Sequence, residues 1–338
     1  MKISICIPTY NRASHLANCL QSIISNQEKD KIDYQVCISD NGSPDNTMEV
    51  VRAAEKEINI KYFRFTENVG RVKNYLKVVD MAQSEFVWLL GDDDLLLPEA
   101  LITVSKLIQE HNDVDFFYVN SFNLSTEYVL SFPQPFDTAN IPKGMTTFSS
   151  YKISEKRSFI SLVDPKVSFD FIGAMFLAIF RRENWVKNVD ALDRDVISDP
   201  RTFSHFDNTF PHVKIFSRAY ANSLAYIFSD PLTVNLSGAR EWAPMSPLIN
   251  IVRLIEALDE YRLNGLSLYQ YLRCKNFALR TFFPDYMRML FRKSESGYGY
   301  IRPINLLLIS LLFPNTWLSP FYYMIEVIKA RLNPERIH

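Results

Sequence analysis

The first 120 residues predict an α/β fold, in which helices flank a mostly parallel sheet and a helical C-terminal extension follows. Short apolar runs alternate with segments whose apolar residues recur at helical spacing, which is typical of parallel strands joined by crossover helices. One such run, at residues 86–90, is followed at once by Asp92, Asp93 and Asp94. Ligands bind at the carboxyl ends of strands in open α/β sheets, so this triplet also indicates the position of the functional site.

Five apolar runs define the expected strands, at residues 3–7, 34–39, 61–65, 86–90 and 115–120. Most of their residues are apolar, as expected for strands that helices cover on both faces. Parallel strands joined by right-handed crossovers end at one edge of the sheet. The loops that follow these strands should therefore meet at that edge.

Four helices are expected between the strands. Their apolar stripes are Leu16, Leu20, Ile23 and Ile24; Met48, Val51 and Ala54; Val72, Tyr75, Leu76 and Val79; and Leu101, Val104, Leu107 and Ile108. Ser14 and Asp45 are placed to cap the first two helices. Pro98 and Glu99 are suited to begin the fourth, because proline and acidic residues are favoured in a first helical turn.

The pattern changes after residue 120. Residues 121–167 are polar and rich in turn residues, and long connections of this kind are often functional. A strand-like apolar run follows at 169–181, and helical spacing resumes at 247–283. We therefore expect the sheet to end near residue 240 and a helical region to occupy residues 241–338.

The tail of the chain combines basic residues with aromatic and aliphatic ones. Its basic residues include Arg280, Arg288, Arg292, Lys293 and Arg302. This mixture is typical of a segment that lies in a membrane interface. The alternative is a hydrophobic helix that packs on the domain or on a second protomer. Pro303, Pro314 and Pro320 should divide the tail into short helices in either case.

Bulk composition excludes other classes of protein. The net charge of −1 gives no basic footprint for nucleic acid. The four cysteines lack metal-ligand spacing, so we expect buried free thiols, which suit a reducing cytoplasm. Met1 leads directly into a strand, so no signal peptide is expected, and no run reaches the roughly 18 apolar residues that span a bilayer.

Three polar loops should converge where the first, second and fourth strands end, at residues 8–12, 40–47 and 91–94. They offer an aromatic ring, a guanidinium group and crowded carboxylates beside helix N-termini, an inventory that suits a nucleotide diphosphate bound through a cation. Hard cations such as Mg²⁺ or Mn²⁺ prefer carboxylate oxygen. The alternative for the triplet is a polar turn that leads into a helix. The G-x-G-x-x-G and G-x-x-x-x-G-K-[ST] patterns are absent, which disfavours a nicotinamide enzyme and a P-loop NTPase.

Four motifs stand in order along this half of the chain: ICIPTYNR at 5–12, SDNGSPDNT at 39–47, NVGRVKN at 68–74 and LGDDDLLLP at 90–98. Together they resemble glycosyltransferase family 2. The resemblance implies a Rossmann-like GT-A fold over residues 1–240, with a nucleotide-binding half at 1–120 and an acceptor half at 121–240. The shorter run Phe210-Pro211-His212-Val213 resembles O-antigen sugar transferases of the abequosyltransferase type.

The resemblance assigns a role to each matching position. Pro8, Thr9, Tyr10 and Arg12 would line the nucleotide pocket, Asp40 would accept a hydrogen bond from the base, and Asn68, Gly70 and Asn74, with Arg71 or Lys73, would shape the far wall. Asp92 would lie near the ribose. Asp93 would bind the Mn²⁺ or Mg²⁺ that bridges the two phosphates, with Asp94 as a second ligand or a supporting carboxylate.

The chain departs from the family where the catalytic base is expected. Family members commonly carry a Glu-Asp pair on the acceptor side, and this chain has Pro211 and His212 there instead. A neutral imidazole suits proton transfer near neutral pH, so His212 is one candidate base. Asp207 is the second candidate and Asp199 the third. A structural role for His212 at the start of its helix is the alternative.

The sequence thus predicts a metal-dependent enzyme that moves one sugar from a nucleotide-sugar donor to a hydroxyl of a glycan or lipid-linked oligosaccharide, in O-antigen or capsule synthesis. We expect it in the cytoplasm, peripheral on the inner leaflet of the inner membrane, with no nucleic-acid partner and with oligomers allowed. Two alternatives remain open. One is a nucleotidyltransferase that makes the sugar nucleotide, and the other is a non-catalytic glycan-binding protein that has lost its base.

Overall fold

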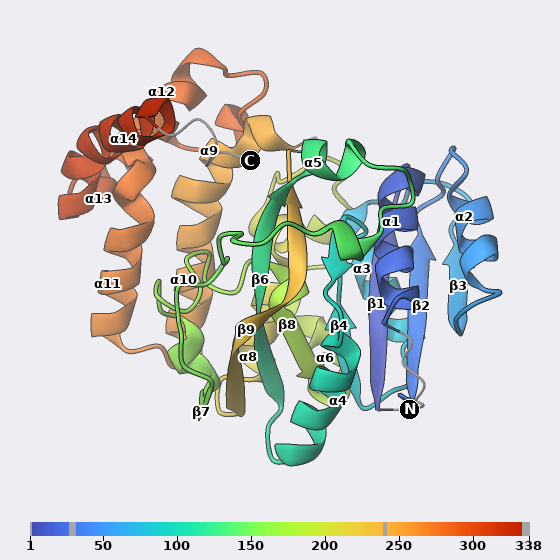
Figure 1. Ribbon diagram of the computed structural model, residues 1–338. Coiled ribbons are helices and arrows are strands. Elements are labelled where there is room, and N and C mark those ends of the chain that lie inside the picture. The colour runs from blue at the N-terminus through green and yellow to red at the C-terminus, as the bar shows by residue number, and fades with distance from the viewer. Residues whose placement is uncertain (1, 27–31, 239–241, 333–338) are drawn as a thin grey trace.

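The computed structural model describes residues 2–26, 32–238 and 242–332. Within these ranges nine strands form one sheet, in the order β3-β2-β1-β4-β8-β6-β9-β5, with β7 paired to β9 (Figure 1). The strands are β1 (Ile3–Thr9), β2 (Tyr34–Asp40), β3 (Ile60–Arg64), β4 (Phe86–Leu89), β5 (Asp94–Leu96), β6 (Phe116–Ser125), β7 (Glu155–Ser158), β8 (Ala178–Arg181) and β9 (Leu224–Ser237).

The sheet has a parallel half and a mixed half. In the first half β1 pairs in parallel with β2 and β4, and β2 pairs in parallel with β3. β8 pairs antiparallel with β4 and β6 and so joins the two halves. β9 is parallel to β6, whereas β5 and β7 pair antiparallel with β9. The expected α/β fold class is confirmed.

Helices cover both faces of the sheet. Figure 1 shows α1 in front of the parallel strands and α3 behind them. The helices before residue 240 are α1 (Ala13–Ile24), α2 (Thr47–Ala54), α3 (Arg71–Met81), α4 (Ala100–Glu110), α5 (Thr126–Leu130), α6 (Arg182–Val186), α7 (Phe206–Thr209) and α8 (Pro211–Ala219). All four helices expected in the first half are present.

Two helix starts differ from the prediction. Ser14 lies inside α1 and does not cap it; the N–H of Ala13 instead donates to Asp45 Oδ2 (2.9 Å). Because Asp45 also accepts from the N–H of Thr47 (3.2 Å), one carboxylate holds the starts of two helices. The fourth helix begins at Ala100, after the residues that form β5.

The mixed half contains the strands that the sequence pattern did not predict. β9 departs from simple alternation because its register with β6 shifts on either side of Asn120, next to Pro231. Only the end of the apolar run at 169–181 is a strand, since Phe171 and Ile172 adopt positive φ angles (55° and 67°) that no strand allows.

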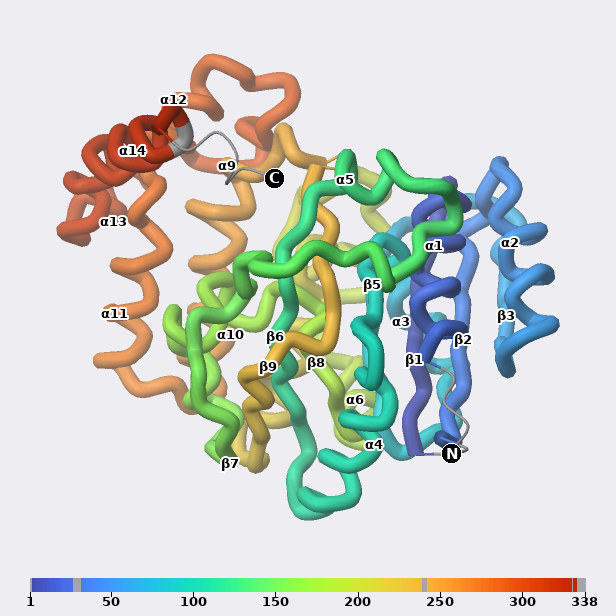
Figure 2. Tube along the Cα trace, in the orientation of Figure 1, coloured from blue at the N-terminus to red at the C-terminus, as the bar shows by residue number. Residues whose placement is uncertain are grey.

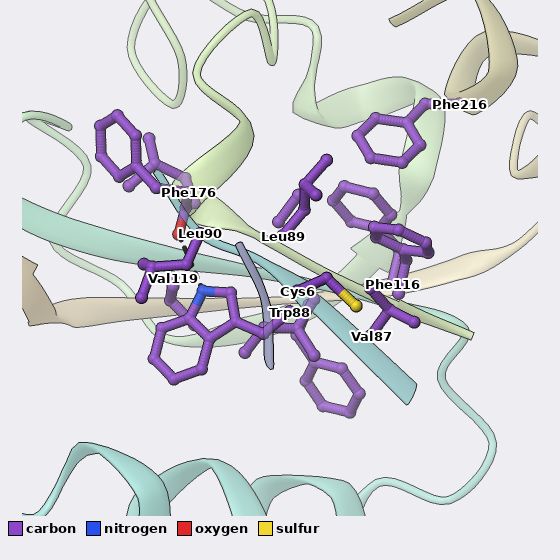
Figure 3. Packing of buried hydrophobic residues seen from close by; sticks show 14 of the residues in the cluster. Cys6, Val87, Trp88, Leu89, Leu90, Phe116, Val119, Phe176 and Phe216 are labelled. Atoms are coloured by element: carbon purple, nitrogen blue, oxygen red, sulfur yellow. Dashed lines mark hydrogen bonds between the residues drawn. The ribbon is translucent and has the colours of Figure 1, made fainter. Parts of the chain in front are cut away.

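Trp88 anchors this irregular segment to the parallel half. Its indole is fully buried, and Nε1 donates to the carbonyl of Phe176 (2.9 Å), as Figure 3 shows beside Leu90 and Val119. The segment before β8 is therefore packed against the carboxyl end of β4, which is where the aspartate triplet follows.

The C-terminal region is helical, as expected. It comprises α9 (Ser246–Leu248), a π-helical turn at Ile249–Arg253, α10 (Leu254–Leu263), α11 (Leu268–Ala278), α12 (Phe282–Phe291), α13 (Pro303–Ser310) and α14 (Pro314–Leu332). These helices lie on the side of the sheet opposite β3 (Figure 2). Leu258, Tyr261 and Cys274 share the core of the sheet, whereas Phe282 and Met289 belong to a second apolar cluster. The predicted division at residue 240 as a domain boundary stays a prediction.

Pro320 lies inside α14 and does not divide the tail there, contrary to expectation. Proline cannot donate to the carbonyl four residues earlier, which here belongs to Thr316. The hydroxyl of Ser319 donates to that carbonyl instead (2.7 Å). The helix therefore continues with this acceptor satisfied, while Pro303 and Pro314 do begin helices.

The prediction of buried free thiols is confirmed for Cys6, Cys19, Cys37 and Cys274. Among the described helices, none is on its own long and apolar enough to cross a bilayer. α13 and residues 314–329 of α14 satisfy the length and composition of a span only when taken together, and a bend of 97° separates them.

Candidate functional site

The loops after β1 and β2 are joined by hydrogen bonds at the carboxyl edge of the sheet. The N–H of Asn11 donates to Ser43 Oγ (2.9 Å), and Asn11 itself has a positive φ of 53°. Pro8 and Thr9 are buried at the end of β1. Tyr10 lies beyond them with 40% of its surface exposed, so its ring is available for stacking on a planar ligand.

Asp40, predicted to accept a hydrogen bond from the base, is buried and already engaged within the chain. Its Oδ1 accepts from the N–H of Ser43 (2.8 Å), and its Oδ2 accepts from the hydroxyl of Tyr62 (2.6 Å) and lies 3.5 Å from Arg64 Nε. Asp40 therefore shapes the loop, and a base could reach it only where Tyr62 or Arg64 gives way. Hydrogen bonding to Asp40 and burial both raise the pKa of Tyr62.

Amide side chains connect this loop to the start of α3. Asn41 Nδ2 donates to Asn68 Oδ1 (2.8 Å), and Asn68 Oδ1 also accepts from the N–H of Gly70 (2.9 Å). Gly42 has a φ of 79°, and a Cβ there would lie 2.8 Å from the backbone carbon of Glu67. The NG pair of the second motif is therefore needed to bring these two loops together.

Residues of α3 face in different directions. Asn74 is buried and its Nδ2 donates to the carbonyl of Thr9 (3.2 Å), whereas Lys73 is exposed to solvent. Arg71 donates from Nη2 to the carbonyl of Asn208 (2.8 Å), and its guanidinium lies 4.2 Å from the ring centre of Phe203. Arg71 thus joins the two halves of the sheet domain, and Asn74 fixes the end of β1.

The aspartate triplet divides into two carboxylates that pair with Arg12, of which Asp92 is buried and Asp93 half-buried, and one buried carboxylate that turns toward Gly91. Arg12 contacts Asp92 (Nη1–Oδ1, 3.1 Å) and Asp93 (Nη2–Oδ2, 2.9 Å), and the Thr9 hydroxyl donates to Asp92 Oδ2 (2.8 Å). Asp94 is 2% exposed, and its Oδ2 accepts from the N–H of Gly91 (3.0 Å). Asp94 thus supports the loop from within through this hydrogen bond, and its assignment as a metal ligand stays a prediction.

Gly91 is required by the crowding of these carboxylates. A Cβ at this position would lie 2.6 Å from Asp94 Oδ2 and 2.9 Å from Asp93 Oδ1. Burial raises the pKa of Asp92 to about 7, and the charge of Arg12 opposes that rise. Cationic charge beyond that of Arg12 would favour the ionised form of Asp92.

Within the described residues, no group of three or more His, Cys, Asp or Glu side chains is arranged to hold a metal ion. The donor set that Asp92 and Asp93 offer nevertheless fits Mg²⁺ or Mn²⁺, because these ions are commonly held by one or two carboxylates together with phosphate oxygens of the substrate. The raised pKa of Asp92 also favours a cation site, because a bound cation would offset the cost of ionising this buried carboxylate.

Two of the three candidate bases from the sequence, His212 and Asp207, are enclosed. His212 is 3% exposed, its Nε2 donates to the carbonyl of Gly173 (2.9 Å), and burial lowers its pKa to about 4. Asp207 is 1% exposed and accepts hydrogen bonds from Lys214 (2.9 Å to each oxygen) and from the N–H of Asp193 (2.8 Å). Asp199 pairs with Arg201 (2.7 Å). These contacts give all three residues structural roles.

Asp170 is a carboxylate that the sequence analysis missed. Burial raises its pKa, and Ser168 Oγ donates to its Oδ1 (2.6 Å). The two residues that follow, Phe171 and Ile172, have positive φ angles, which are strained for a bulky and a β-branched residue. Strain of this kind concentrates at functional sites. Sequence periodicity could not reveal it, because the segment reads as a plain apolar run.

The comparisons with known proteins agree with this geometry. Residues 4–177 match the family model of glycosyl transferase family 2, so the chain belongs to that family, and the resemblance inferred from the sequence is confirmed.

Two curated relatives resemble part of the chain. It is 39% identical over 116 residues to abequosyltransferase RfbV of Salmonella typhimurium, covering 34% of each chain. It is 38% identical over 115 residues to the GalNAc(5)-diNAcBac-PP-undecaprenol beta-1,3-glucosyltransferase of Campylobacter jejuni, covering 33% of this chain and 35% of the relative. The match thus spans about a third of the length of each relative.

Solved structures share the fold over most of the chain. TarS 1-349 of S. aureus in complex with UDP-GlcNAc covers 89% of both chains with a TM-score of 0.52 and 16% identity. The mannosyltransferase PcManGT of Pyrobaculum calidifontis, in complex with GDP-Man and Mn²⁺, covers 98% of this chain and 87% of its own, with a TM-score of 0.50 and 16% identity. The predicted GT-A fold is therefore confirmed.

Proposed function

We propose that the protein transfers a single sugar from a nucleotide-sugar donor to a hydroxyl group of a glycan or lipid-linked oligosaccharide during synthesis of a bacterial surface polysaccharide. The arrangement of Arg12 with Asp92 and Asp93 at the carboxyl edge of the sheet carries this proposal. The family membership and the relatives named above support it. The nucleotidyltransferase alternative is disfavoured, because that class of enzyme requires a glycine-rich loop after the first strand, and residues 8–12 contain no glycine.

The donor would lie across the three joined loops. Tyr10 offers its exposed ring to the base, and Arg12 can move from the carboxylates to the diphosphate, where its charge offsets the charge of the leaving group. Asp93, with Asp92, would hold Mg²⁺ or Mn²⁺, and that ion would stabilise the negative charge that develops on the nucleoside diphosphate. Thr9 and Gly91 keep the two carboxylates in place.

The acceptor hydroxyl must lose a proton as the new glycosidic bond forms. We favour Asp170 for this step over His212 and Asp207. Burial raises the pKa of Asp170, which favours its protonated form after it accepts a proton, and the residue as a whole is half-buried. Asp207 is neutralised by Lys214, and His212 uses Nε2 to hold the carbonyl of Gly173. In this proposal His212 positions the loop that carries Asp170.

We further propose that the C-terminal helices hold the enzyme on the inner leaflet of the membrane. Many large apolar side chains of α13, α14 and the turn between them are exposed, including Ile304, Leu308, Leu312, Trp317, Phe321 and Ile328. Large exposed apolar patches commonly mark interaction sites on proteins. Basic residues such as Arg292 and Lys293 lie nearby in the chain, so the surface suits anionic lipid. A second protomer on this face is the alternative.

Incubation with a panel of nucleotide sugars tests the central proposal. With Mn²⁺ present, one donor should raise the melting temperature and release its nucleoside diphosphate slowly even without acceptor. If no donor stabilises the fold or turns over, the protein is not a transferase for that panel, and the alternative of a glycan-binding protein gains support. The matched control is Asp93→Asn, for which the donor should neither raise the melting temperature nor release nucleoside diphosphate.

A further inference from the structure

A cavity lies between the 147–169 segment and the C-terminal helices, and none of the residues that line it belongs to the loops at 8–12, 40–47 and 91–94. Its volume is about 690 Å³, which is in the range of small-molecule sites. Its walls include the aromatic residues Phe148, Phe169 and Phe277 and the basic residues Lys166, Arg273 and Arg280. The cavity therefore joins apolar surface to positive charge.

The charges of the cavity are only partly compensated. Arg273 donates two hydrogen bonds to Asp164 (2.7 Å each) and is neutralised. The guanidinium carbon of Arg280 lies over the ring of Phe277, 3.8 Å from its centre, and the charge of Glu326 acts on Arg280. Within the described part of the chain, no carboxylate oxygen lies within 4.0 Å of Arg280 or Lys166. The positive charges of Arg280 and Lys166 are therefore available to a bound anion, which would accept charge-assisted hydrogen bonds from them.

Residues that line the cavity adjoin two other features of the chain. Phe169 lines it, and the next residue is Asp170, the proposed base. Asn315 also lines it, at the start of α14, where its N–H donates to Asn276 Oδ1 (3.0 Å). Trp317 and Leu318 follow Asn315 and are exposed. A ligand in the cavity would thus adjoin both the residue proposed as base and the proposed membrane face.

We infer that this cavity binds the phosphate or diphosphate group of the acceptor, in the form of a phosphoanion that carries a glycan on one side and a long apolar chain on the other. The cationic residues Arg280 and Lys166 bind the phosphoanion. The exposed side chains of α14 receive the apolar chain, and Phe148 and Phe169 stack with the first sugars. The inference rests on the proposed function and adds the anchoring group of its acceptor.

The test uses the full chain and farnesyl diphosphate as a soluble probe, with EDTA present so that divalent cations do not support binding at the donor site. Binding by the wild-type protein is compared with Arg280→Gln and Lys166→Gln. Loss of one charge-assisted hydrogen bond should weaken binding by about tenfold to a hundredfold. Arg52→Gln removes the same charge from an exposed position at the end of α2, outside both the cavity and the tail, and should bind as the wild type does. If Arg280→Gln does not fold, Lys166→Gln decides, because that side chain is exposed.

Three outcomes would overturn the inference. Both variants retain wild-type affinity, farnesol binds as tightly as farnesyl diphosphate, or soluble dihexanoyl phosphatidylglycerol displaces the probe at equal phosphate concentration. The last outcome would assign the cavity to bulk lipid headgroups. Release of nucleoside diphosphate by the wild-type protein without acceptor reports on the proposed function separately, so the two failures are distinguishable.

Discussion

Arg71 reaches from α3 to the carbonyl of Asn208, 2.8 Å away, and so ties the parallel half of the sheet to α7, just before α8 begins. The same guanidinium lies over the ring of Phe203 and within 3.4 Å of the carbonyl of Thr209. Burial lowers the pKa of this arginine. The contact shows how a residue of the motif at 68–74 holds a segment more than 130 residues away in the chain.

Arg71→Met should lower the free energy of unfolding by about 1–3 kcal/mol, because two carbonyls and one aromatic ring lose a cationic partner. Urea denaturation measures the change. Lys73→Met is the matched control, since Lys73 is exposed on the same helix and its substitution should stay within roughly 0.5 kcal/mol of the wild type. Equal effects of the two substitutions would argue against the link.

Mn²⁺ should stabilise the protein more at pH 8 than at pH 5. Burial raises the pKa of Asp92 to about 7 from its ordinary value of 3.8, so the folded state retains a proton that the unfolded chain has lost between these values. Without metal, this group therefore lowers the free energy of unfolding as pH rises toward about 7. A bound cation favours the ionised carboxylate of Asp92, so with Mn²⁺ this group should no longer lower the free energy of unfolding as pH rises. Melting temperatures with and without Mn²⁺ measure it, and Asp92→Asn should remove the difference between the two pH values.

Asp170→Asn should reduce transfer to the acceptor by about a hundredfold or more, because loss of a general base typically costs that much. Release of nucleoside diphosphate to water should fall far less. His212→Gln serves as the comparison and should act mainly through stability. If His212→Gln instead abolishes transfer in a fully folded protein, while Asp170→Asn is active, the base assignment reverts to the histidine.

The enclosed imidazole of His212 should make the protein sensitive to mild acid. Its pKa is lowered to about 4 by burial from an ordinary 6.5, so its contribution is complete above about pH 6.5 and is lost as pH falls through about 4. The loss corresponds to roughly 3 kcal/mol. Its sign is opposite to that of Asp92. Denaturant titrations of the wild type and His212→Gln between pH 4 and pH 7 separate the two contributions, and parallel curves would contradict this account.

Leu312→Ser combined with Phe321→Ser should weaken binding to vesicles that contain phosphatidylglycerol by about tenfold or more, because each buried apolar side chain contributes about 1.5–3 kcal/mol. Both residues are largely exposed, at 80% and 55%, so the fold should tolerate the change. Leu263→Ser is the matched control, being equally exposed but outside the tail. Unchanged vesicle binding together with a change in oligomeric state would favour a second protomer on this face.

Much of the parallel half could be predicted because its signals are local. Alternating apolar runs and helical stripes reproduced β1 to β4 and the four helices between and after them, and the polar loops at 8–12, 40–47 and 91–94 do meet at one edge. β5 and β9 escaped prediction, since a three-residue strand and a strand with a shifted register leave no regular period.

The sequence by itself determined the family, the α/β order and the residues at the carboxyl edge of the parallel strands, because spacing along the chain specifies which side chains follow each strand. Only the tertiary structure decided what each of them faces. In the folded chain Asp94 accepts a hydrogen bond from the N–H of Gly91, and Asp40 accepts one from the hydroxyl of Tyr62. His212 and Asp207 are buried, whereas Asp170 precedes two residues with positive φ angles. Burial and hydrogen bonds between distant segments set the pKa and the accessibility of a side chain, and neither can be read from neighbours in the chain.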